Sequence, residues 1–350
     1  MRLVVLRFSA LGDVTLLVPV LQHLATLHPD KRITIVSRPH LAPLFEPLPV
    51  DFFPVDLKEK HQGIMGLWRL ARQIHRAYRR EGYQVIDQHA VLRTYLVGFF
   101  LRLRGIKVWR LRKDRPARKA LTVPPPKQLK PLPHVTQRYW DTFHRSGLVV
   151  ADPPPSWPVP TYKMARTTAA WWTQHRGRLN LAFAPTAAHA SKRWPRDYSV
   201  QLLRRWAREK DAKVWLLGAP AEKAELEALL RESGAAGGVL AGRYPFDQEI
   251  ALLEEMDALV AMDSFNMHLG ALAAVPLLVI WGGTHPAAGF APVSTGPQEH
   301  LAVPQEELAC RPCSIYGRED CPRQDFACLQ RVAPAQAWSA LQRLIPSLEA

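Results

Sequence analysis

The stretch from Ala258 to His285 reads ALVAMDSFNMHLGALAAVPLLVIWGGTH. It begins with an apolar run, Ala258–Met262, that is short enough for a buried strand, and it breaks at Asp263-Ser264. The residues that follow have helical spacing until Pro276 ends the pattern, and Leu277–Trp281 forms a second apolar run. A strand, a polar turn, a helix and a second strand predict one βαβ unit. Such units build doubly wound parallel sheets.

Polar side chains follow both predicted strands. Asp263, Ser264 and His268 lie around the start of the helix, and Thr284 and His285 come after the second strand. Ligands of such units bind beyond the carboxyl ends of the strands, where helix N-termini present free backbone N–H groups. Small polar residues there favour a phosphorylated, hydroxylated ligand. Asp263-Ser264 could instead only cap the helix, but a cap alone does not account for His268 or for the Gly-Gly-Thr-His sequence.

Length and composition limit the class of protein. The 350 residues are enough for two domains, and 47% hydrophobic residues with 11 Trp exclude a disordered chain. The net charge of +15 predicts an anionic partner: a phosphate-bearing substrate, an acidic lipid surface or nucleic acid. No apolar run reaches the ~20 residues of a transmembrane helix. Gly12 and Asp13 interrupt the amino-terminal apolar run, so we expect a first strand rather than a signal peptide, and a cytoplasmic protein.

The first half opens like a doubly wound domain. Leu3–Leu6 predicts a strand, residues 7–13 (RFSALGD) predict a turn, and Val14–Leu27 predicts a helix with a kink at Pro19. The turn lacks the GxGxxG pattern of dinucleotide-binding proteins. Asp13 is its one carboxylate, placed at a helix N-terminus. It could face a ligand, or it could only interact favourably with the helix dipole.

Basic residues are concentrated later in this half. Gly66–Arg80 predicts a basic amphipathic helix and Tyr83–Asp87 a strand. Residues 102–119 hold nine Lys or Arg and one acidic residue, and they predict a helix end, a strand over Lys107–Leu111 and a basic loop. Exposed faces normally mix both charges, so we favour an anion-facing surface over a merely solvated one. Aromatic residues are sparse there, which disfavours nucleic-acid binding.

Residues 151–160 (ADPPPSWPVP) predict a semi-rigid linker between two domains. Beyond it, strands are predicted over Leu179–Phe183, Val214–Leu217 and Val239–Gly242, alternating with helices. The loop after the first of these strands carries two adjacent cations, Lys192 and Arg193. This regular alternation predicts a second domain of the same kind as the first.

All four cysteines lie in one late segment, at Cys310, Cys313, Cys321 and Cys328. A CxxC pair followed by two more cysteines could bind zinc. The gaps are short and irregular, and we favour reduced thiols in a surface loop that is dispensable for chemistry. Residues 334–348 predict an amphipathic C-terminal helix.

Together these segments resemble glycosyltransferase family 9, the heptosyltransferases of lipopolysaccharide assembly. The resemblance covers almost the whole chain and rests on the order and spacing of RFSALGDV, IDQHAVLR, APTAAHASKRWP, LLGAPAE, the stretch after Met262 and the late cysteines. The chain departs from the family at Phe265, where the family usually has a glycine that would let donor phosphates approach the backbone.

The resemblance implies the GT-B fold, an α/β architecture of two Rossmann-like doubly wound domains facing each other across a cleft. Residues 1–155 would form the acceptor-binding domain and residues 156–332 the nucleotide-sugar-binding domain. Residues 333–350 would form a C-terminal helix packing back on the first domain. The implied activity is metal-independent and inverts the anomeric centre. It transfers heptose from ADP-heptose to a phosphorylated lipopolysaccharide inner core, with the enzyme peripheral at the cytoplasmic face of the inner membrane.

The resemblance also implies residue roles. Asp13 would be the general base for the acceptor hydroxyl, Lys192 would pair with the donor diphosphate, and Glu222 would bind the nucleoside ribose. The implied donor-binding residues are Thr186, Lys192, Arg193, Gly218, Glu222, Gly242, Asp263, Ser264, His268, Thr284 and His285. The implied acceptor-binding residues are Ser9, Gly12, Gln88, His89 and Arg93.

No cofactor and no nucleic-acid partner are expected. The chain has no Asp-x-Asp motif to hold a divalent metal on the diphosphate, so Lys192, Arg193 and a helix dipole would replace the metal. Two other hypotheses stay open. One is a GT-B transferase of a different sugar, and the other is a non-catalytic nucleotide or nucleic-acid binder, which would have no need of Asp13.

Overall fold

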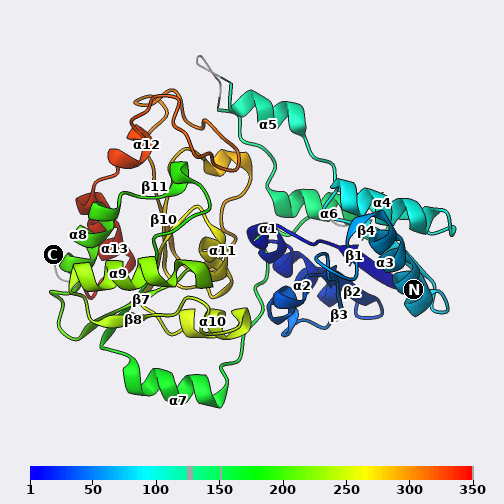
Figure 1. Cartoon of the computed structure of the whole chain (residues 1–350), viewed down its shortest axis with the longest axis horizontal. Helices are drawn as coiled ribbons and strands as arrows, with labels where there is room; N and C mark the ends of the chain where they lie inside the picture. Colours follow the sequence, from blue (N-terminus) through cyan, green and yellow to red (C-terminus); the bar gives the residue numbers. More distant parts are fainter. Residues whose placement is uncertain (124–128, 150–151, 349–350) are drawn as a thin grey trace. The chain divides into compact units, whose positions relative to one another are not determined.

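The computed structural model describes residues 1–123, 129–149 and 152–348. The chain forms two compact units, one of Met1–Asp114 with Pro133–Pro160 and one of Arg115–Leu132 with Thr161–Ala350 (Figure 1). Ala151 of the predicted linker and the last two residues of the predicted C-terminal segment lie outside the described residues. Within the described ranges, every helix is too short or too polar to cross a membrane.

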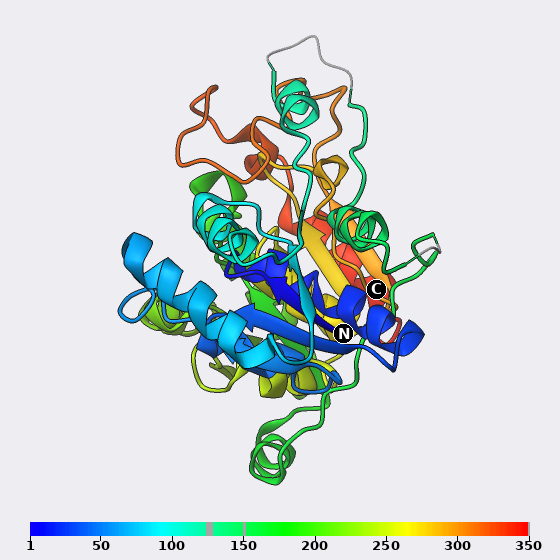
Figure 2. The same ribbon diagram turned by 90° about the vertical axis from the view of Figure 1, so that its right-hand side faces the viewer.

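The first unit is built on a parallel sheet of five strands in the order β3-β2-β1-β4-β5. Its strands are β1 (Arg2–Leu6), β2 (Arg32–Ser37), β3 (Asp51–Pro54), β4 (Tyr83–Asp87) and β5 (Val108–Arg110). Its helices are α1 (Leu11–Thr15), α2 (Val18–Leu27), η1 (Pro39–Phe45), α3 (Gly63–Tyr78), α4 (Leu92–Arg102) and α6 (Val135–Arg145). Figure 2 shows α3 and α4 on one side of the strands and α2 on the other.

The register of this sheet brings two loops together. Leu6 at the end of β1 pairs with Asp87 at the end of β4, so the loops that begin after these residues leave the sheet side by side. The strand order reverses between β1 and β4. Their carboxyl ends therefore form the topological switch point at which open α/β sheets bind ligands.

The second unit contains a parallel sheet of six strands in the order β11-β10-β9-β6-β7-β8. Its strands are β6 (Leu179–Ala184), β7 (Ala212–Leu216), β8 (Gly237–Val239), β9 (Ala258–Met262), β10 (Leu277–Ile280) and β11 (Gln298–Leu301). Here the order reverses between β6 and β9, where Ala184 pairs with Ala261. This arrangement gives the second unit a switch point like that of the first.

The helices of the second unit connect these strands. They are α5 (Arg115–Leu121), α7 (Arg166–His175), η2 (Ala190–Lys192), α8 (Arg196–Trp206), η3 (Pro220–Glu222), α9 (Lys223–Ser233), α10 (Phe246–Leu253), α11 (Phe265–Leu272), η4 (Pro286–Ala288), α12 (Ala327–Gln330) and α13 (Pro334–Leu344). Apolar residues of α8, α9 and α13 pack on β6, β7 and β10 in the main core of this unit.

The prediction of two doubly wound α/β halves is confirmed, and so is the βαβ unit over residues 258–280. β3 and β11 were not predicted, because each is a four-residue edge strand without a buried residue. The single helix predicted over Val14–Leu27 is wrong. The structure ends α1 at Thr15 and starts α2 at Val18, with Pro19 in the first turn. Proline has no N–H to bond the preceding turn, which makes it a residue for helix starts.

The boundaries between the halves also differ from the prediction. Arg115–Leu132 belongs to the second unit, and part of the predicted basic loop is the helix α5. Residues 152–160 of the predicted linker pack on the first unit. The ring of Trp157 lies against Trp140, with centroids 5.6 Å apart, and His23, at 5.9 Å.

The C-terminal helix α13 does not follow the expectation that it packs on the first domain. It packs on α8, β10 and β11 in the second unit, where Trp338 and Leu341 are buried in the core. Its apolar stripe therefore completes the layer of helices on one face of the second sheet.

Candidate functional site

Asp13 lies at the carboxyl edge of the first sheet, in the first turn of α1 directly after Gly12. Its carboxylate Oδ2 is 2.5 Å from Nη2 of Arg7, whose side chain is only 5% exposed. Arg7 also donates to the backbone carbonyl of Gln88 at the end of β4, and its guanidinium lies over the ring of Tyr139 at 5.7 Å. Arg7 therefore fixes the orientation of the Asp13 carboxylate. Arg7 was not among the predicted site residues, although a charged residue directly after a buried strand was a usable signal.

Ser9 and His89 come together at the same edge. Ser9 Oγ is 3.2 Å from His89 Nε2, and burial lowers the pKa of His89 to about 3, with smaller contributions from Arg7 and Lys113. His89 is therefore neutral at pH 7. The loop that carries it is held by Asp87, whose Oδ1 accepts hydrogen bonds from the N–H groups of His89 and Ala90.

Four cationic side chains, those of Arg7, Lys113, Arg38 and Arg93, help to lower the pKa of His89. Arg93 is exposed in the first turn of α4, whereas Gln88 is fully buried and donates its amide to the Tyr139 carbonyl at 2.9 Å. This edge of the first unit is thus suited to an anionic ligand, with Asp13 as the carboxylate next to Arg7.

In the second unit, Lys192, Asp263 and Thr284 form one cluster. Lys192 Nζ in η2 is 3.0 Å from Asp263 Oδ2 after β9, and Thr284 Oγ1 after β10 donates to the same oxygen at 2.6 Å. Lys192 Nζ also donates to the Tyr316 carbonyl at 3.4 Å. The structure thus brings together three predicted donor-binding residues that lie far apart in the sequence.

The N-terminus of α11 borders this cluster. Ser264 is its N-cap residue but makes no side-chain cap hydrogen bond, and Ser264 Oγ is buried without a hydrogen-bond partner in the described ranges. Asp263 bonds Lys192 and Thr284 instead. The interpretation of Asp263-Ser264 as only a helix cap therefore does not fit the structure. The first N–H groups of α11 suit an anion.

Two further features of α11 bear on the site. Phe265, which stands where the resemblance expects glycine, packs its ring on Phe246 of α10 at 4.9 Å between centroids. His268 lies one turn into α11 and is buried.

A second group gathers beside β6 and β7. Thr186 is buried after β6, and a Cβ at Gly218 would lie 3.5 Å from Thr186 Oγ1 and 2.9 Å from Glu222 Oε2. Gly218 therefore allows Glu222 to approach closely. Glu222 Oε2 accepts from the Ala219 N–H at 2.6 Å, and Gly242, with φ +69°, packs against η3 at Pro220.

Arg193 and His285 lie at the margins of these clusters. The exposed Arg193 is 4.0 Å from Glu222 Oε1 and donates to the Ala187 carbonyl at 2.7 Å. His285 begins η4, where its Nδ1 accepts from the Ala287 N–H, and burial lowers the pKa of His285 to about 4. The predicted donor-binding residues thus lie in the segments that follow the carboxyl ends of the second sheet's strands, with His268 one turn into α11.

Arg311 is a positioning residue that the sequence analysis missed. It is 2% exposed, and its guanidinium donates to the carbonyls of Gly282, Thr284 and Val303. A Cβ at Gly282 would lie 2.3 Å from the Ser191 carbonyl oxygen, so glycine is required for the close approach of these two loops. Through its bonds to the Gly282 and Thr284 carbonyls, Arg311 holds the backbone after β10. Arg311 itself lies between Cys310 and Cys313, in the cysteine-containing segment.

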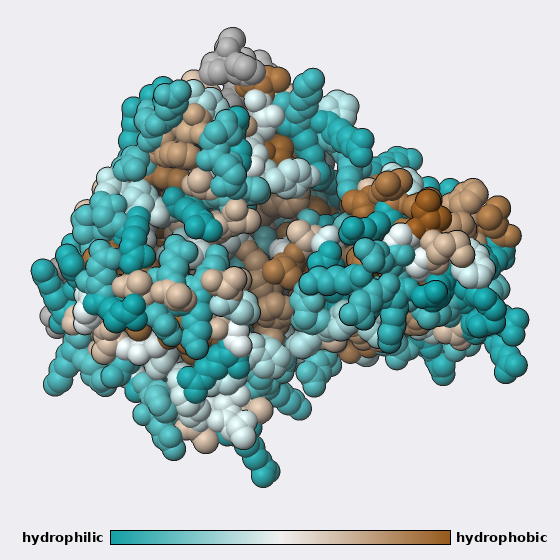
Figure 3. Space-filling model, viewed as in Figure 1, coloured by the Kyte–Doolittle hydropathy of each residue, from teal (hydrophilic) through white to brown (hydrophobic). Residues whose placement is uncertain are grey.

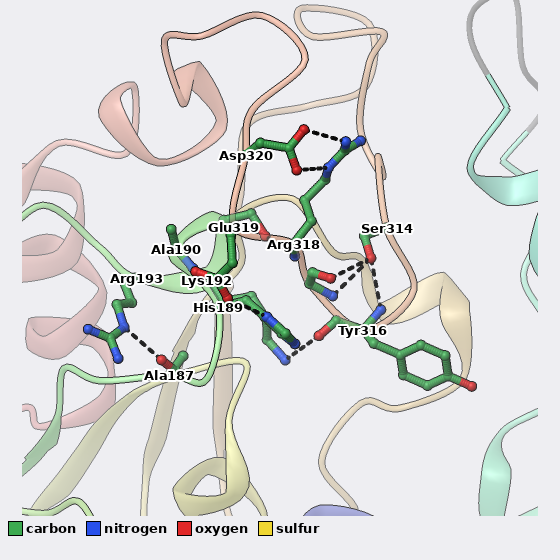
Figure 4. Close-up of polar contacts among 12 residues, drawn as sticks. Ala187, His189, Ala190, Lys192, Arg193, Ser314, Tyr316, Arg318, Glu319 and Asp320 are labelled. Atoms are coloured by element: carbon green, nitrogen blue, oxygen red, sulfur yellow. Dashed lines mark hydrogen bonds and ion pairs between the residues drawn. The ribbon is translucent and has the colours of Figure 1, made fainter. Parts of the chain in front are cut away.

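The same segment fastens the Lys192 loop (Figure 4). His189 Nδ1 is 2.7 Å from Glu319 Oε1, the Ser191 N–H donates to the Arg318 carbonyl at 3.0 Å, and Ser191 Oγ accepts from the Arg318 N–H at 2.9 Å. Residues 311–319 therefore contact both sides of the Lys192–Asp263 cluster, and the dispensability of the cysteine segment for chemistry stays a prediction.

The four cysteines are free thiols, and Cys328 is buried in the core of the second unit. Burial is the main cause that raises the pKa of the Cys328 thiol to about 12. Among the residues that the structure describes, no group of three or more His, Cys, Asp or Glu is arranged to hold a metal ion.

Comparisons with known proteins agree with this architecture. No curated protein matches the chain in sequence. In structure, it is similar to glycosyl transferase family 9 from Veillonella parvula DSM 2008, with a TM-score of 0.74, 20% identity and coverage of 99% of this chain and 98% of the other. It is similar to E. coli ADP-heptose LPS heptosyltransferase II, with a TM-score of 0.72, 19% identity and full coverage of both chains.

A more distant structure is the iron-containing dodecameric glycosyltransferase TibC from enterotoxigenic E. coli H10407. Its TM-score is 0.57 at 12% identity, over 99% of this chain and 78% of that chain. The model of glycosyltransferase family 9 (heptosyltransferase) matches residues 111–313, more than half of the sequence. The chain has two α/β units, each with a parallel sheet, as in the GT-B fold, and it belongs to glycosyltransferase family 9.

Proposed function

We propose that this enzyme transfers heptose from ADP-heptose to a phosphorylated lipopolysaccharide inner core, with inversion at the anomeric carbon. The enzyme would act at the cytoplasmic face of the inner membrane. The observation that carries the proposal is the cluster of Lys192, Asp263 and Thr284 beside the N-terminus of α11, where Ser264 provides no cap. A cation next to free helix N–H groups is a site for a diphosphate.

The donor is assigned to the second unit. The Lys192 ammonium has three N–H donors, of which one is directed at Asp263 and one at the Tyr316 carbonyl, and the third is proposed to bind the diphosphate. Glu222 is proposed to accept hydrogen bonds from the ribose hydroxyls, with Thr186, Gly218 and Gly242 beside it. The choice of ADP-heptose follows the structural similarity to a protein described as an ADP-heptose heptosyltransferase.

The acceptor is assigned to the first unit. Four cations lie around His89, and a phosphorylated core oligosaccharide supplies the complementary negative charge. Ser9, His89 and Arg93 are proposed to bind its hydroxyl and phosphate groups, close to Asp13 at the same edge. Gly12 would contribute backbone, and Gln88 would position the loop through its bond to Tyr139.

The chemistry needs one base and one stabilised leaving group. The acceptor hydroxyl oxygen attacks the anomeric carbon and forms the new glycosidic bond, while the bond from that carbon to the diphosphate oxygen breaks. Asp13 takes the hydroxyl proton. Lys192 and the α11 N-terminus stabilise the charge that develops on the departing ADP.

We further propose that the transfer needs no divalent metal, because Lys192, Arg193 and the α11 N-terminus supply the positive charge. TibC, a similar protein, is described as iron-containing, so iron belongs in the test. Turnover is expected to be unchanged after EDTA treatment and after addition of magnesium, manganese or iron. If EDTA abolished turnover and one of these metals restored it, this part of the proposal would be overturned.

The decisive experiment screens nucleotide sugars. ADP-heptose, other ADP-sugars, UDP-sugars and ADP alone are compared by thermal shift and then by transfer to lipopolysaccharide acceptors truncated at successive core positions. A ligand present at 100 times its Kd stabilises by about 2.7 kcal/mol. We expect ADP-heptose to give the largest shift and to be the productive donor. A larger shift and faster transfer with another nucleotide sugar would identify a different transferase, and nucleotide binding without any transfer would identify a binding protein.

A further inference from the structure

The helix α4 is apolar on two opposite faces. Its inner face buries Val97, Gly98 and Leu101 in the first unit. Its outer face exposes Leu92 (74%), Tyr95, Phe99 (53%) and, directly after its last turn, Leu103 (69%). These four residues follow helical spacing and form one continuous stripe, here called the α4 stripe.

The neighbouring helix extends this surface. α3 packs against α4, and its first turn exposes Ile64 (63%) and Met65 (68%). Both helices begin at the carboxyl edge of the first sheet, and the α4 stripe starts three residues after His89. Figure 3 shows the apolar side chains gathered over α4. A contiguous exposed apolar surface on a water-soluble unit marks a docking site.

The charges around the stripe define what docks there. Neither α3 nor α4 contains an acidic residue. The exposed cations on these helices and just after them are Arg69, Arg72, Arg76, Arg79, Arg80, Arg93, Arg102 and Lys107. None of them forms an ion pair with a carboxylate in the ranges that the structure describes. The surface therefore combines exposed aromatic and aliphatic side chains with uncompensated positive charge.

We propose that the α4 stripe and the start of α3 insert into the headgroup boundary of an anionic lipid bilayer, with the surrounding arginines on lipid phosphates. Amphipathic surfaces of this composition bind anionic membranes. A second copy of the chain fits less well, because a two-fold contact through this face would oppose arginines with arginines. The inference deepens the proposed function, since it places the acceptor edge of the first unit at the surface that carries a lipid-linked acceptor.

The test uses vesicle co-sedimentation without any lipopolysaccharide, so that it measures docking and not transfer. We compare phosphatidylcholine vesicles with vesicles that also contain phosphatidylglycerol, at low and high salt. Wild type should bind the anionic vesicles and lose binding as salt rises. Phe99→Ser with Leu103→Ser should weaken this binding by at least about tenfold, because the apolar insertion is removed.

The matched control is Leu27→Ser, which removes a similarly exposed apolar side chain (44%) from α2. It should bind vesicles like wild type, and all variants should keep their circular dichroism and their ADP affinity. Three results would each overturn the proposal. Wild type could bind neutral vesicles as well as anionic ones, or the double variant could bind anionic vesicles as well as wild type does. The third result is that wild type self-associates and the double variant does not. A chain that docks but transfers no heptose would refute only the proposed function.

Discussion

The contact between Asp13 and Arg7 holds the carboxylate that we propose as the general base. The pair joins the first turn of α1 to a buried guanidinium that also bonds the end of β4. Arg7 therefore orients the carboxylate toward a fixed direction at the sheet edge. A carboxylate that only stabilised the helix dipole would need no such partner.

The first prediction concerns Asp13→Asn. The side chain keeps its size but cannot accept the acceptor proton, so turnover should fall by about 10²–10⁴-fold while donor affinity stays near normal. Turnover, ADP-heptose affinity and melting temperature are measured together, with Asp30→Asn as the control for loss of an exposed carboxylate in the same unit. Near-normal turnover in a slightly destabilised protein would leave Asp13 a role in helix stability only, worth roughly 0.3–1 kcal/mol.

The second prediction concerns pH and His89. Burial lowers its pKa from the ordinary 6.5 to about 3. As pH falls below 6.5, the unfolded chain binds a proton that the folded His89 does not. The free energy of unfolding therefore decreases toward pH 3, by up to about 1.4 kcal/mol per pH unit from this group. His89→Gln should flatten that decrease and leave the slope above pH 7 unchanged.

Urea unfolding at several pH values between about 7 and 4 measures this effect. Substitution of the exposed His175 by Gln is the control for removal of a histidine from another part of the chain. If the wild-type and His89→Gln curves were parallel throughout, His89 would not be a source of the acid sensitivity.

At the scale of elements, the site of the second unit depends on a segment that contributes no predicted ligand contact. The stretch from Arg311 to Glu319 holds the backbone after β10 on one side and the Lys192 loop on the other. The two loops bond each other through the Gly283 N–H and the Ser191 carbonyl, 2.8 Å apart, and this third segment adds bonds to both.

The third prediction follows from Arg311. Arg311→Met keeps much of the side-chain volume but leaves three buried carbonyls without their donor, and the free energy of unfolding should fall by about 2–4 kcal/mol. ADP affinity should also fall, because the backbone at Thr284 loses its support. The exposed Arg331, with one long bond to Glu307, provides the control Arg331→Met. If Arg311→Met kept the stability and the ADP affinity of wild type, other contacts would hold the loop at Thr284.

At the scale of the molecule, each unit has its own core and its own switch point. Cations surround His89 in the first unit, and the second unit combines Lys192 with a helix N-terminus. Two anionic substrates are thereby assigned to different units.

The fourth prediction tests this division by hydrogen exchange. Addition of ADP should slow exchange in the loops at 185–193, 263–268 and 282–285, because a bound diphosphate orders their N–H groups. The loop at residues 7–13 in the first unit should change little. Lys192→Met, which removes the proposed diphosphate ligand, should abolish the protection. Stronger protection in the first unit than in the second would reverse the assignment of donor and acceptor.

Much of this molecule was determined locally by the sequence. The buried strands of a parallel sheet are continuous apolar runs, so β1, β4, β6, β9 and β10 could be predicted close to their actual bounds. Asp263 comes directly after β9 and Thr284 soon after β10, so the strand ends alone pointed to these two residues. His89 and the donor role of Lys192 came from the family resemblance, and the site as a whole stays a prediction.

Other features were decided only by tertiary structure, because they depend on contacts between residues far apart in the chain. The edge strands β3 and β11 have only four residues each and form by pairing with a neighbour. The placement of α13 depends on the apolar surface of the second unit that it covers, and that of α5 on contacts such as those of Arg118 with Phe290 and Tyr316. Arg311 is a surface-type residue by composition. In the structure it is buried, and its guanidinium donates to three carbonyls of the loops beyond β10. A buried guanidinium needs such acceptors, and only the tertiary structure brings these three together.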